Sequence, residues 1–284
     1  AQGIIRSYVP SVCLLHVSVA FRDKDSGQRL RYGGINPQGE PLQDSEGHPI
    51  FTLSGPGPEV RADFFGSGFL VAAEGRILTN HHVVEPWWKN DELDRVTRQG
   101  LEAVIAEISA YFPDAPRGYS VEIEKISAEE DLAVVRGDLA ELKRRVLSLD
   151  GSREAAVSGQ PVVSIGYATG LSAILARAGE DQVQEIVAAT GGKPRQVMAE
   201  LARRKLIRPL TTQGHIGDVL PDNIVYDSQT ASGGSGGPLF NQQGKVIGVT
   251  YAVVRGFGGS NFGVPIRYAV YGAGEVALVL VHGW

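Results

Sequence analysis

Ser235 lies in the segment TASGGSGGPLFN, residues 230–241, with two glycines on each side of it. A serine hydroxyl is a poor nucleophile at neutral pH, so it needs a nearby base, a partner that orients the base, and donors for the oxyanion. Glycines suit the last requirement, because a backbone without Cβ atoms can turn its N–H groups towards a substrate carbonyl. The segment therefore indicates a flexible linker, a turn or a nucleophile loop.

One hydrolase motif, the G-x-S-x-G elbow, is matched literally by Gly233, Ser235 and Gly237. In that elbow a helix follows the serine directly, and the acidic residue and the histidine come later in the chain. Here Pro238 opposes a helix, the residues after it have the pattern of a β-hairpin, and no aspartate occurs after Ser235. These features exclude the elbow.

A second hydrolase setting has the chain order histidine, aspartate, serine on paired β-barrels. It requires a histidine at the end of an early strand, an aspartate before a later apolar strand, and a serine late in the chain. The segment GRILTNHHVV supplies His81 and His82, and the segment EEDLAVV supplies Asp131. All three residue types therefore occur in the order that this chemistry needs.

The elements that would position these residues are short strands. Runs rich in Val, Ile and Tyr, bounded by Gly and Pro, predict at least ten of them. They do not alternate with helices, so antiparallel β-barrels or a sandwich are expected rather than a parallel sheet. The predicted strands are 12–21, 67–72, 76–80, 119–126, 132–136, 161–167, 223–227, 237–240, 245–254 and 261–265.

Three other segments interrupt the strands. A polar loop extends over 22–63, and loops of this length are typically functional or disordered. Residues 88–110 carry apolar side chains at helical spacing and predict a helical insert, although the segment could end as a strand. Residues 172–207 predict two more helices, which are separated by TGG and have Pro194 near the start of the second.

The helical segment 172–207 also has a basic character, with seven basic and four acidic residues between Arg177 and Arg208. A helix, glycines and a second helix could form a DNA-binding helix-turn-helix, but a solvated basic face on an insertion explains the same residues. Nothing else in the chain favours nucleic acid, and its net charge is −5 at pH 7. We therefore expect no nucleic-acid partner.

Length and composition set the class of protein. A chain of 284 residues with 43% hydrophobic and 21% charged residues is typical of globular proteins with one large or two small cores. Its apolar runs are far shorter than the ~20 residues of a membrane span, so none is expected. The first residues, AQGIIRS, lack a methionine, and we therefore expect a processed or truncated product.

No metal or cofactor is expected. The only cysteine, Cys13, lies in an apolar run and is interpreted as a buried small hydrophobe. His48, His215 and His282 have no acid-rich or cysteine partners at metal-ligand spacing. His16 alternates with apolar residues in a predicted strand and is interpreted as a core or barrel-surface histidine.

Four ordered segments around the candidate residues resemble the HtrA (Deg) branch of the trypsin-like serine proteases. That branch has the blocks G-S-G-[FV], T-N-x-H-V, D-[LI]-A-[VL] and G-[ND]-S-G-G-P. The corresponding segments of this chain are Gly66–Phe69, Thr79–Val83, Asp131–Val134 and Gly233–Pro238. The resemblance covers residues 64–266, which is most of the chain.

The resemblance implies an all-β, chymotrypsin-like fold of two six-stranded antiparallel β-barrels with helical insertions. It places one protease domain over 1–284, with an N-terminal barrel at 8–145 and a C-terminal barrel at 155–270. The long loop 22–63 and the helical insert 88–110 would belong to the first barrel, and the insert 172–207 to the second.

The resemblance also assigns roles to single residues. His82 would be the general base and acid, Asp131 the residue that orients and stabilises it, and Ser235 the nucleophile that forms an acyl-enzyme. His82 is preferred to His81 because the family's histidine is followed by valine, and His81 stays as the alternative. The backbone N–H groups of Gly233 and Ser235 would form the oxyanion hole.

Gly234 departs from the family, in which Asn, or Asp in secreted trypsins, precedes the nucleophile. An aspartate there ties the loop down by an ion pair, so a glycine leaves the loop with more conformational freedom. We hypothesise that the oxyanion hole is ordered by substrate or by a partner.

The specificity pocket is expected to involve Gln229, Thr230 and Tyr251. Gln229 stands where trypsins carry a pocket aspartate, so cleavage after Lys or Arg is not expected. Tyr251 lies with small apolar residues on the facing strand, which favours small or medium uncharged side chains. The alternative is that Gln229 points away from the pocket.

The expected function is a serine endopeptidase that acts on protein or peptide substrates in an extracytoplasmic bacterial compartment, periplasmic or secreted. The alternative is a catalytically silent binding or chaperone-like module on a protease fold, because a fold does not guarantee its chemistry. No PDZ domain is recognisable at the C-terminal end. The helical inserts are therefore candidate surfaces for a regulatory partner, and assembly into a homo-oligomer is a further hypothesis.

Overall fold

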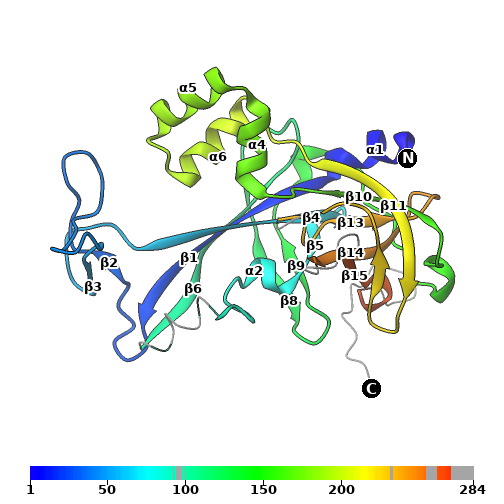
Figure 1. Ribbon diagram of the computed structural model, residues 1–284, viewed down its shortest axis with the longest axis horizontal. Helices are drawn as coiled ribbons and strands as arrows, with labels where there is room; N and C mark the ends of the chain where they lie inside the picture. The colour runs from blue at the N-terminus through cyan, green and yellow to red at the C-terminus, as the bar shows by residue number, and fades with distance from the viewer. Residues whose placement is uncertain (92, 94–97, 99, 231–232, 254–260, 270–284) are drawn as a thin grey trace. The chain divides into compact units, whose positions relative to one another are not determined.

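The computed structural model describes the chain except for residues 92, 94–97, 99, 231–232, 254–260 and 270–284. Strands form most of its regular secondary structure (Figure 1). Its contacts divide the chain into two compact units. The larger unit comprises Ala1–His16, Phe65–Val84 and Ser109–Trp284, and the smaller unit comprises Val17–Phe64 and Glu85–Ile108.

The larger unit contains a closed barrel of six strands (Figure 1). Neighbouring strands pair antiparallel, and the pair Val163↔Phe240 helps to close the barrel. Leu239 is fully buried in a cluster with Ile216 and Tyr226, whereas Val249 is fully buried in a second cluster, because neighbouring residues of a strand face opposite sides of the sheet. In barrel order the strands are β10 (Pro161–Gly166), β11 (Leu210–Val219), β12 (Ile224–Tyr226), β15 (Asn261–Pro265), β14 (Val246–Val253) and β13 (Pro238–Phe240).

The second large sheet has seven strands. Three of them, β1, β4 and β6, contain residues of both units, and the others belong to the larger unit. In sheet order they are β7 (Tyr119–Ser120), β6 (Leu101–Tyr111), β1 (Val12–Asp23), β4 (Arg61–Ala72), β5 (Arg76–Thr79), β9 (Leu132–Arg136) and β8 (Glu122–Ser127).

The all-β class and the double-barrel type of fold are confirmed, and each of the ten predicted strands overlaps an observed one. One sheet is the expected closed barrel of six strands, whereas the other has seven strands rather than six. The barrel boundaries 8–145 and 155–270 stay a prediction.

The helical insert predicted at 88–110 does not extend over its last part, where Leu101–Tyr111 forms strand β6, so the alternative that the segment ends as a strand is confirmed. The apolar residues there include Val104, Ile105 and Ile108, whose branched side chains suit a strand as well as a helix. Hydrogen bonding to β1 and β7 decides in favour of the strand. Six residues of the preceding part, 92, 94–97 and 99, lie outside the described residues.

The helical insert at 172–207 is confirmed, and its two predicted helices are preceded by a third. The last helix, α6, buries Val197, Met198 and Leu201. None of the described helices has the length and apolar character needed to cross a membrane. The helices are α1 (Gln2–Tyr8), α2 (His81–Val84), α4 (Gly170–Ala178), α5 (Glu180–Thr190) and α6 (Pro194–Arg203), with short 3₁₀ helices η1 (Val9–Ser11), η2 (Ala140–Leu142), η3 (Arg153–Ala155) and η4 (Ile266–Tyr268).

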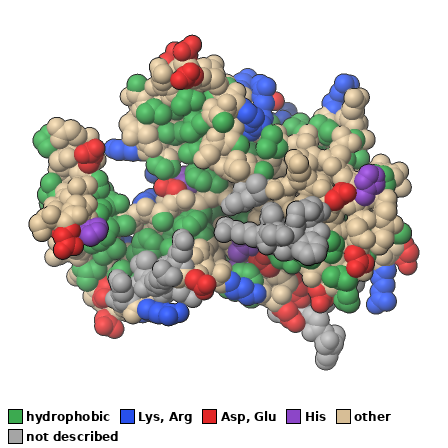
Figure 2. Space-filling view, viewed as in Figure 1, with side chains coloured by type: hydrophobic (Ala, Val, Ile, Leu, Met, Phe, Trp, Pro, Cys, Tyr) green, Lys and Arg blue, Asp and Glu red, His purple; other side chains and the backbone are tan. Residues whose placement is uncertain are grey.

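Basic residues of this insert are paired with acidic ones. Arg203 and Arg204 both bind Glu200, and Arg204 also binds Glu185 on the neighbouring helix α5. On the face that Figure 2 shows, acidic, apolar and basic side chains all occur at the top of the molecule, where the insert lies. The pairing favours the solvated-face interpretation over a DNA-binding helix-turn-helix.

The smaller unit contains the long polar segment 22–63, which is folded rather than structureless. Strands β2 (Arg31–Tyr32) and β3 (Phe51–Thr52) pair antiparallel, and an isolated bridge joins Ile35 to Pro41. Asn36 Oδ1 accepts the N–H groups of Gln38 and Glu40, a typical side-chain turn.

Candidate active site

The three predicted triad residues lie in loops or short turns at strand ends of the larger unit. His82 is in α2, directly after β5, and Asp131 directly precedes β9. β5 and β9 pair, with Thr79 opposite Ala133, so the end of one strand lies beside the start of the other. Ser235 lies three residues before β13 of the closed barrel.

His82 and Asp131 are joined by two hydrogen bonds. His82 Nδ1 lies 2.7 Å from Asp131 Oδ2, and the His82 backbone N–H donates to Asp131 Oδ1 at 3.0 Å. A carboxylate at Nδ1 favours the tautomer that carries its proton there, which leaves Nε2 as the proton acceptor. The side chain of His82 is 32% exposed, so substrate can reach the ring, whereas Asp131 is 14% exposed.

Asp131 adopts a backbone conformation that few non-glycine residues adopt, with φ +54°. This left-handed conformation costs about 1 kcal/mol for a residue with a Cβ. The carbonyl oxygen of Asp131 accepts hydrogen bonds from Asn80 Nδ2 at 2.8 Å and from the His81 N–H at 3.2 Å. Asn80 and His81 therefore hold the backbone of Asp131, and His82 binds its carboxylate.

Ser235 does not share a hydrogen bond with His82 among the described residues. Its Oγ donates to the carbonyl oxygen of Tyr251 at 3.1 Å. The structure thus connects His82 with Asp131 by hydrogen bonds, and it leaves the serine hydroxyl on another acceptor. Catalytic hydrogen bonds often form fully only with substrate bound, so this geometry does not remove Ser235 as the candidate nucleophile.

The nucleophile loop, residues 233–237, depends on glycines with positive φ. Gly233 has φ +88° and Gly236 has φ +85°. A Cβ on Gly236 would lie 1.9 Å from the carbonyl oxygen of Ser67, and a Cβ on Gly233 would lie 2.6 Å from that of Tyr167. Neither position can accept a side chain without movement of the backbone.

The predicted oxyanion donors belong to this loop. Within the part of the chain that the structure describes, the N–H groups of Gly233 and Ser235 donate to no protein acceptor. Ala231 and Ser232, which precede Gly233, lie outside the described residues. The oxyanion role of the two N–H groups, and their ordering by substrate or a partner, stay predictions.

The predicted pocket residues do not all line one cavity. Gln229 and Thr230 line a cavity of about 230 Å³ next to Gly234. Its other described lining residues come from β10, β11 and the turn after β10 and carry no charge: Ser164, Gly166, Ala168, Thr169, Leu210 and Thr212. The role of this cavity in specificity stays a prediction.

Tyr251 is not among the described residues that line that cavity. Its hydroxyl donates to Asn223 Oδ1 at 2.7 Å, and its ring lies 6.3 Å from that of Phe262. Burial raises the pKa of Tyr251, and the negative charge of Asp131 raises it further. Tyr251 therefore contacts the candidate site through its carbonyl oxygen and through the field of Asp131.

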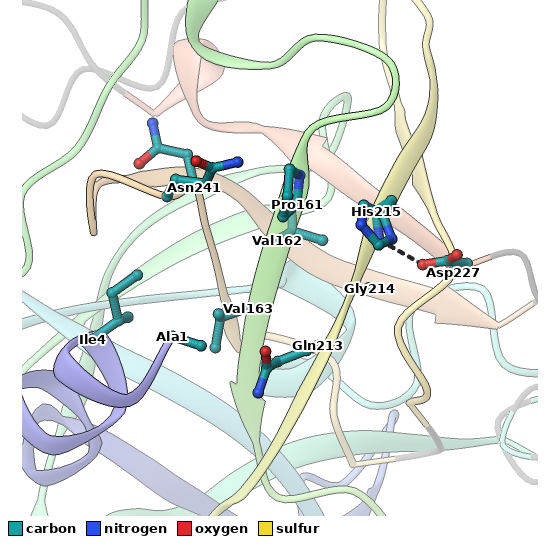
Figure 3. Close-up of a pocket in the computed structure, with 11 residues that line it drawn as sticks. Ala1, Ile4, Pro161, Val162, Val163, Gln213, Gly214, His215, Asp227 and Asn241 are labelled. Carbon is teal, nitrogen blue, oxygen red and sulfur yellow. Dashed lines mark hydrogen bonds between the residues drawn. The ribbon is translucent and has the colours of Figure 1, made fainter.

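A larger cavity, of about 600 Å³, lies on the closed barrel without any triad residue among its described lining residues (Figure 3). Val162 and Val163 of β10 line it together with Gln213 of β11. At its edge the backbone N–H of His215 donates to Asp227 Oδ1 at 2.5 Å. The described lining of this cavity therefore lacks the proposed base, its acidic partner and the nucleophile.

Metal ligation has no support among the described residues, where no group of three or more His, Cys, Asp and Glu side chains converges. His16 is 4% exposed and stacks on Phe65 with ring centroids 4.9 Å apart. The interpretation of His16 as a core histidine is thus confirmed. His48 lies at the surface beside Asp44 and Glu46, and His282 lies outside the described residues.

Sequence reasoning missed two residues that shape this site, Ser67 and Asn80. Ser67 Oγ donates to the carbonyl oxygen of Gly233 at 2.8 Å, and Asn80 binds the backbone of Asp131. Both lie inside the segments that carry the family resemblance. Ser67 lies inside β4 and Asn80 directly follows β5, and their polar side chains beside apolar residues were the available signal.

The family model of the trypsin-like peptidase domain matches residues 66–249, which include His82, Asp131 and Ser235. The chain belongs to the trypsin-like peptidases. This trypsin-like peptidase is 29% identical over 204 residues to a probable periplasmic serine endoprotease DegP-like of Chlamydia muridarum, covering 72% of this chain and 31% of the relative. It is 30% identical over 274 residues to the protein of the same name from Hahella chejuensis, covering 94% of this chain and 46% of the relative.

Solved structures confirm the fold of this trypsin-like peptidase. The serine endoprotease from Yersinia pestis matches with a TM-score of 0.52 at 17% identity, over 93% of this chain and 61% of that chain. The HtrA-type protease AlgW with a decapeptide matches with a TM-score of 0.54 at 21% identity, over 94% of this chain and 64% of that chain. The chain spans less than half the length of the two curated relatives.

Proposed function

We propose that this trypsin-like peptidase is an HtrA-type serine endopeptidase with the triad His82, Asp131 and Ser235. The observation that carries the proposal is the pair of hydrogen bonds between His82 and Asp131. A carboxylate that binds Nδ1 of a partly exposed imidazole prepares Nε2 to accept a proton. Ser235 supplies the hydroxyl, on a loop that glycines allow to approach a substrate closely.

The proposed reaction begins when Ser235 Oγ leaves the Tyr251 carbonyl oxygen and donates to His82 Nε2. Oγ then attacks the scissile carbonyl carbon, and its proton passes to Nε2, while Asp131 stabilises the imidazolium that forms. The N–H groups of Gly233 and Ser235 stabilise the oxyanion, and each such donor is worth roughly 2.7 to 4 kcal/mol. Nε2 next protonates the leaving amine, which completes the acyl-enzyme.

Water completes the proposed cycle. His82 Nε2 takes a proton from the water as it attacks the ester carbonyl, and it returns that proton to Ser235 Oγ when the acid product leaves. No metal or cofactor takes part, because the imidazole carries every proton and the oxyanion donors are backbone groups.

The proposed specificity is for small or medium uncharged side chains. The cavity beside Gln229 and Thr230 supports it, since its volume of about 230 Å³ is limited and none of its described lining residues is charged. Protein or peptide substrates and an extracytoplasmic location follow from relatives that are named periplasmic serine endoproteases. A regulatory partner at the helical insert and a homo-oligomer remain part of the proposal.

A fluorophosphonate probe and unfolded casein test the proposed activity. We expect the wild type to be labelled and to cleave casein, and the variant Ser235→Ala to do neither. One observation favours the alternative of a silent binding module, namely the hydrogen bond of Ser235 Oγ to Tyr251 rather than to His82. A folded wild type that neither labels nor cleaves would support that alternative and contradict the endopeptidase.

A further inference from the structure

Ser67 of β4 is a fully buried polar residue outside the proposed triad. Its Oγ accepts a hydrogen bond from the Tyr167 N–H at 2.8 Å and donates one to the Gly233 carbonyl oxygen at 2.8 Å. These partners lie 100 and 166 residues away in the chain. One hydroxyl therefore connects β4, the end of β10 and the nucleophile loop.

The backbone of Ser67 contacts the same loop beyond Gly234. Its N–H donates to the carbonyl oxygen of Ser235 at 2.7 Å. Its own carbonyl oxygen accepts a hydrogen bond from Thr79 Oγ1 at 2.7 Å and faces Gly236, where a Cβ would lie 1.9 Å away. Ser67 thus binds carbonyl groups at both ends of the segment 233–235.

Gly234 explains why the loop needs support from another element. It has no side chain, so it cannot anchor the loop through an ion pair or a side-chain hydrogen bond, and among the described residues its carbonyl oxygen accepts only a local bond from the Gly237 N–H at 3.1 Å. Ordering two adjacent glycines before the nucleophile is costly in conformational entropy. The two hydrogen bonds from Ser67 compensate by fixing the peptide group that precedes Gly234 and the one that follows Ser235.

We propose that Ser67 is a positioning residue whose hydroxyl fixes the backbone of the nucleophile loop from which Ser235 acts. By fixing the Gly233 carbonyl group, it sets the orientation of the peptide that enters Gly234 and the position of Ser235 behind it. Ser67 touches no reacting atom and acts only through the loop. Its catalytic consequence rests on the proposed endopeptidase function, whereas its anchoring of the loop does not depend on turnover.

The variant Ser67→Ala tests this role. It removes the hydroxyl between the buried Tyr167 N–H and the Gly233 carbonyl oxygen, so the loop is expected to move. Because displacement of a catalytic group by about 1 Å costs up to about 100-fold, we expect fluorophosphonate labelling and kcat to fall about 10- to 100-fold. KM should change much less than kcat, since Ser67 does not contact substrate.

Two further variants separate positioning from general stability. Ser67→Cys keeps a side chain of similar size with a weaker donor and acceptor, so a smaller loss in the same direction is expected. Thr190→Val is the matched control, because Thr190 Oγ1 is also buried, donates to the Ile186 carbonyl oxygen at 2.6 Å and accepts the Gly192 N–H at 3.3 Å. It removes an equivalent hydroxyl from the insert, away from the nucleophile loop.

Hydrogen exchange of a peptic fragment containing 233–241 gives a readout that needs no activity. We expect faster exchange in Ser67→Ala and, more weakly, in Ser67→Cys, but unchanged exchange of this fragment in Thr190→Val. Melting temperatures of all variants correct the rates for the folded fraction.

Unchanged loop exchange in folded Ser67 variants would overturn the proposal, and so would faster exchange with an unchanged labelling rate. An equal loss of labelling per folded molecule in Ser67→Ala and Thr190→Val would overturn it as well. A wild type that neither labels nor cleaves contradicts the endopeptidase function instead. Loop exchange then still decides whether Ser67 anchors the loop.

Discussion

At the scale of single residues, two adjacent histidines differ in the features that proton transfer requires. His82 offers an imidazole that is bound at Nδ1 by Asp131 and is 32% exposed. His81 is 3% exposed, and its backbone N–H donates to the carbonyl oxygen of Asp131. His82 can therefore exchange a proton with Ser235 when substrate is bound, whereas His81 supports the backbone conformation of Asp131.

We therefore expect His82→Ala to lower kcat by several orders of magnitude, about as much as loss of the nucleophile, with little change in melting temperature. His81→Ala should instead lower the melting temperature, because it removes a buried side chain, and folded molecules should still be labelled. Fluorophosphonate labelling and differential scanning calorimetry of both variants measure the difference. If His81→Ala abolished labelling in the folded protein while His82→Ala did not, the assignment of the base would be reversed.

The sequence could identify His82, Asp131 and Ser235 because each lies in a short segment whose neighbours carry the signal. The roles of Ser67 and Asn80 could not be identified in that way. Ser67 acts on Gly233, which is 166 residues away, and Asn80 acts on the backbone of Asp131, which is 51 residues away. Such roles depend on which strand ends meet in the fold, and residue types alone do not contain this information.

At the scale of elements, the nucleophile loop depends on Gly236 for two reasons, its positive φ and the lack of space for a Cβ. Substitutions can separate these two effects. Gly236 has φ +85°, and a Cβ there would lie 1.9 Å from the Ser67 carbonyl oxygen. Gly159 has nearly the same conformation, φ +83°, but no atom lies within 4 Å of the position that a Cβ would take there. Gly159→Ala therefore measures the cost of the backbone conformation without the clash.

We expect Gly159→Ala to cost about 1 kcal/mol of unfolding free energy and to leave labelling unchanged. Gly236→Ala should cost at least about 3 kcal/mol and reduce labelling of the folded protein strongly, because the clash displaces the loop from β4. Urea unfolding and fluorophosphonate labelling of both variants provide the comparison. Equal losses in the two variants would contradict the close packing of Gly236 on Ser67.

Glu200 of helix α6 is an acidic residue whose ionised form is strongly favoured in the folded protein. Hydrogen bonds from Arg203 and then from Arg204 lower the pKa of Glu200 from 4.5 to about 2. A carboxyl with a lowered pKa in the folded state stabilises the fold above its unfolded pKa, and this contribution is lost as the pH falls towards the folded pKa.

The melting temperature of Glu200→Gln should accordingly lie below that of the wild type at pH 6, and the difference should shrink between pH 4.5 and pH 2. The difference should be small, because ion pairs near the surface contribute little and Arg203 is 67% exposed. Glu185→Gln removes an ion pair of Arg204 without the contacts to Arg203 and serves as the control. A difference that grew as the pH fell would contradict the ionised state of Glu200 in the folded protein.

Strands β6 and β11 are examples of elements that the sequence pattern predicted poorly. β11 was not predicted, since only Ile216 of its ten residues is buried and two glycines interrupt it. For β6 a helix was the first prediction and a strand the alternative, because a half-buried run of Val and Ile fits both the helical and the strand period. Strand partners, β1 and β7 for β6 and β10 and β12 for β11, determine both elements.

At the scale of the whole molecule, the candidate site depends on cooperative folding of segments that are far apart in the chain. Asp131 precedes a strand of the seven-stranded sheet, whereas Ser235 precedes a strand of the closed barrel. Ser67 links the two, as its strand β4 belongs to the sheet and its partners Tyr167 and Gly233 belong to the barrel segments. Global unfolding should therefore abolish the whole site at once. A buried group that reacts only after global unfolding can report on this loss.

Cys13 provides that reporter. Its side chain on β1 is fully buried, and burial raises the pKa of its thiol, so the reactive thiolate is disfavoured in the folded protein. We expect Ellman's reagent at pH 8 to react with the native chain at least about 10³-fold more slowly than with the chain in urea, because reaction requires global unfolding. The rate should rise in parallel with loss of fluorophosphonate labelling across the urea transition, and Ser235→Ala should leave the thiol rate unchanged. Reaction of one thiol per chain within minutes under native conditions, with labelling intact, would contradict the burial of Cys13 and with it the packing of β1 in this core.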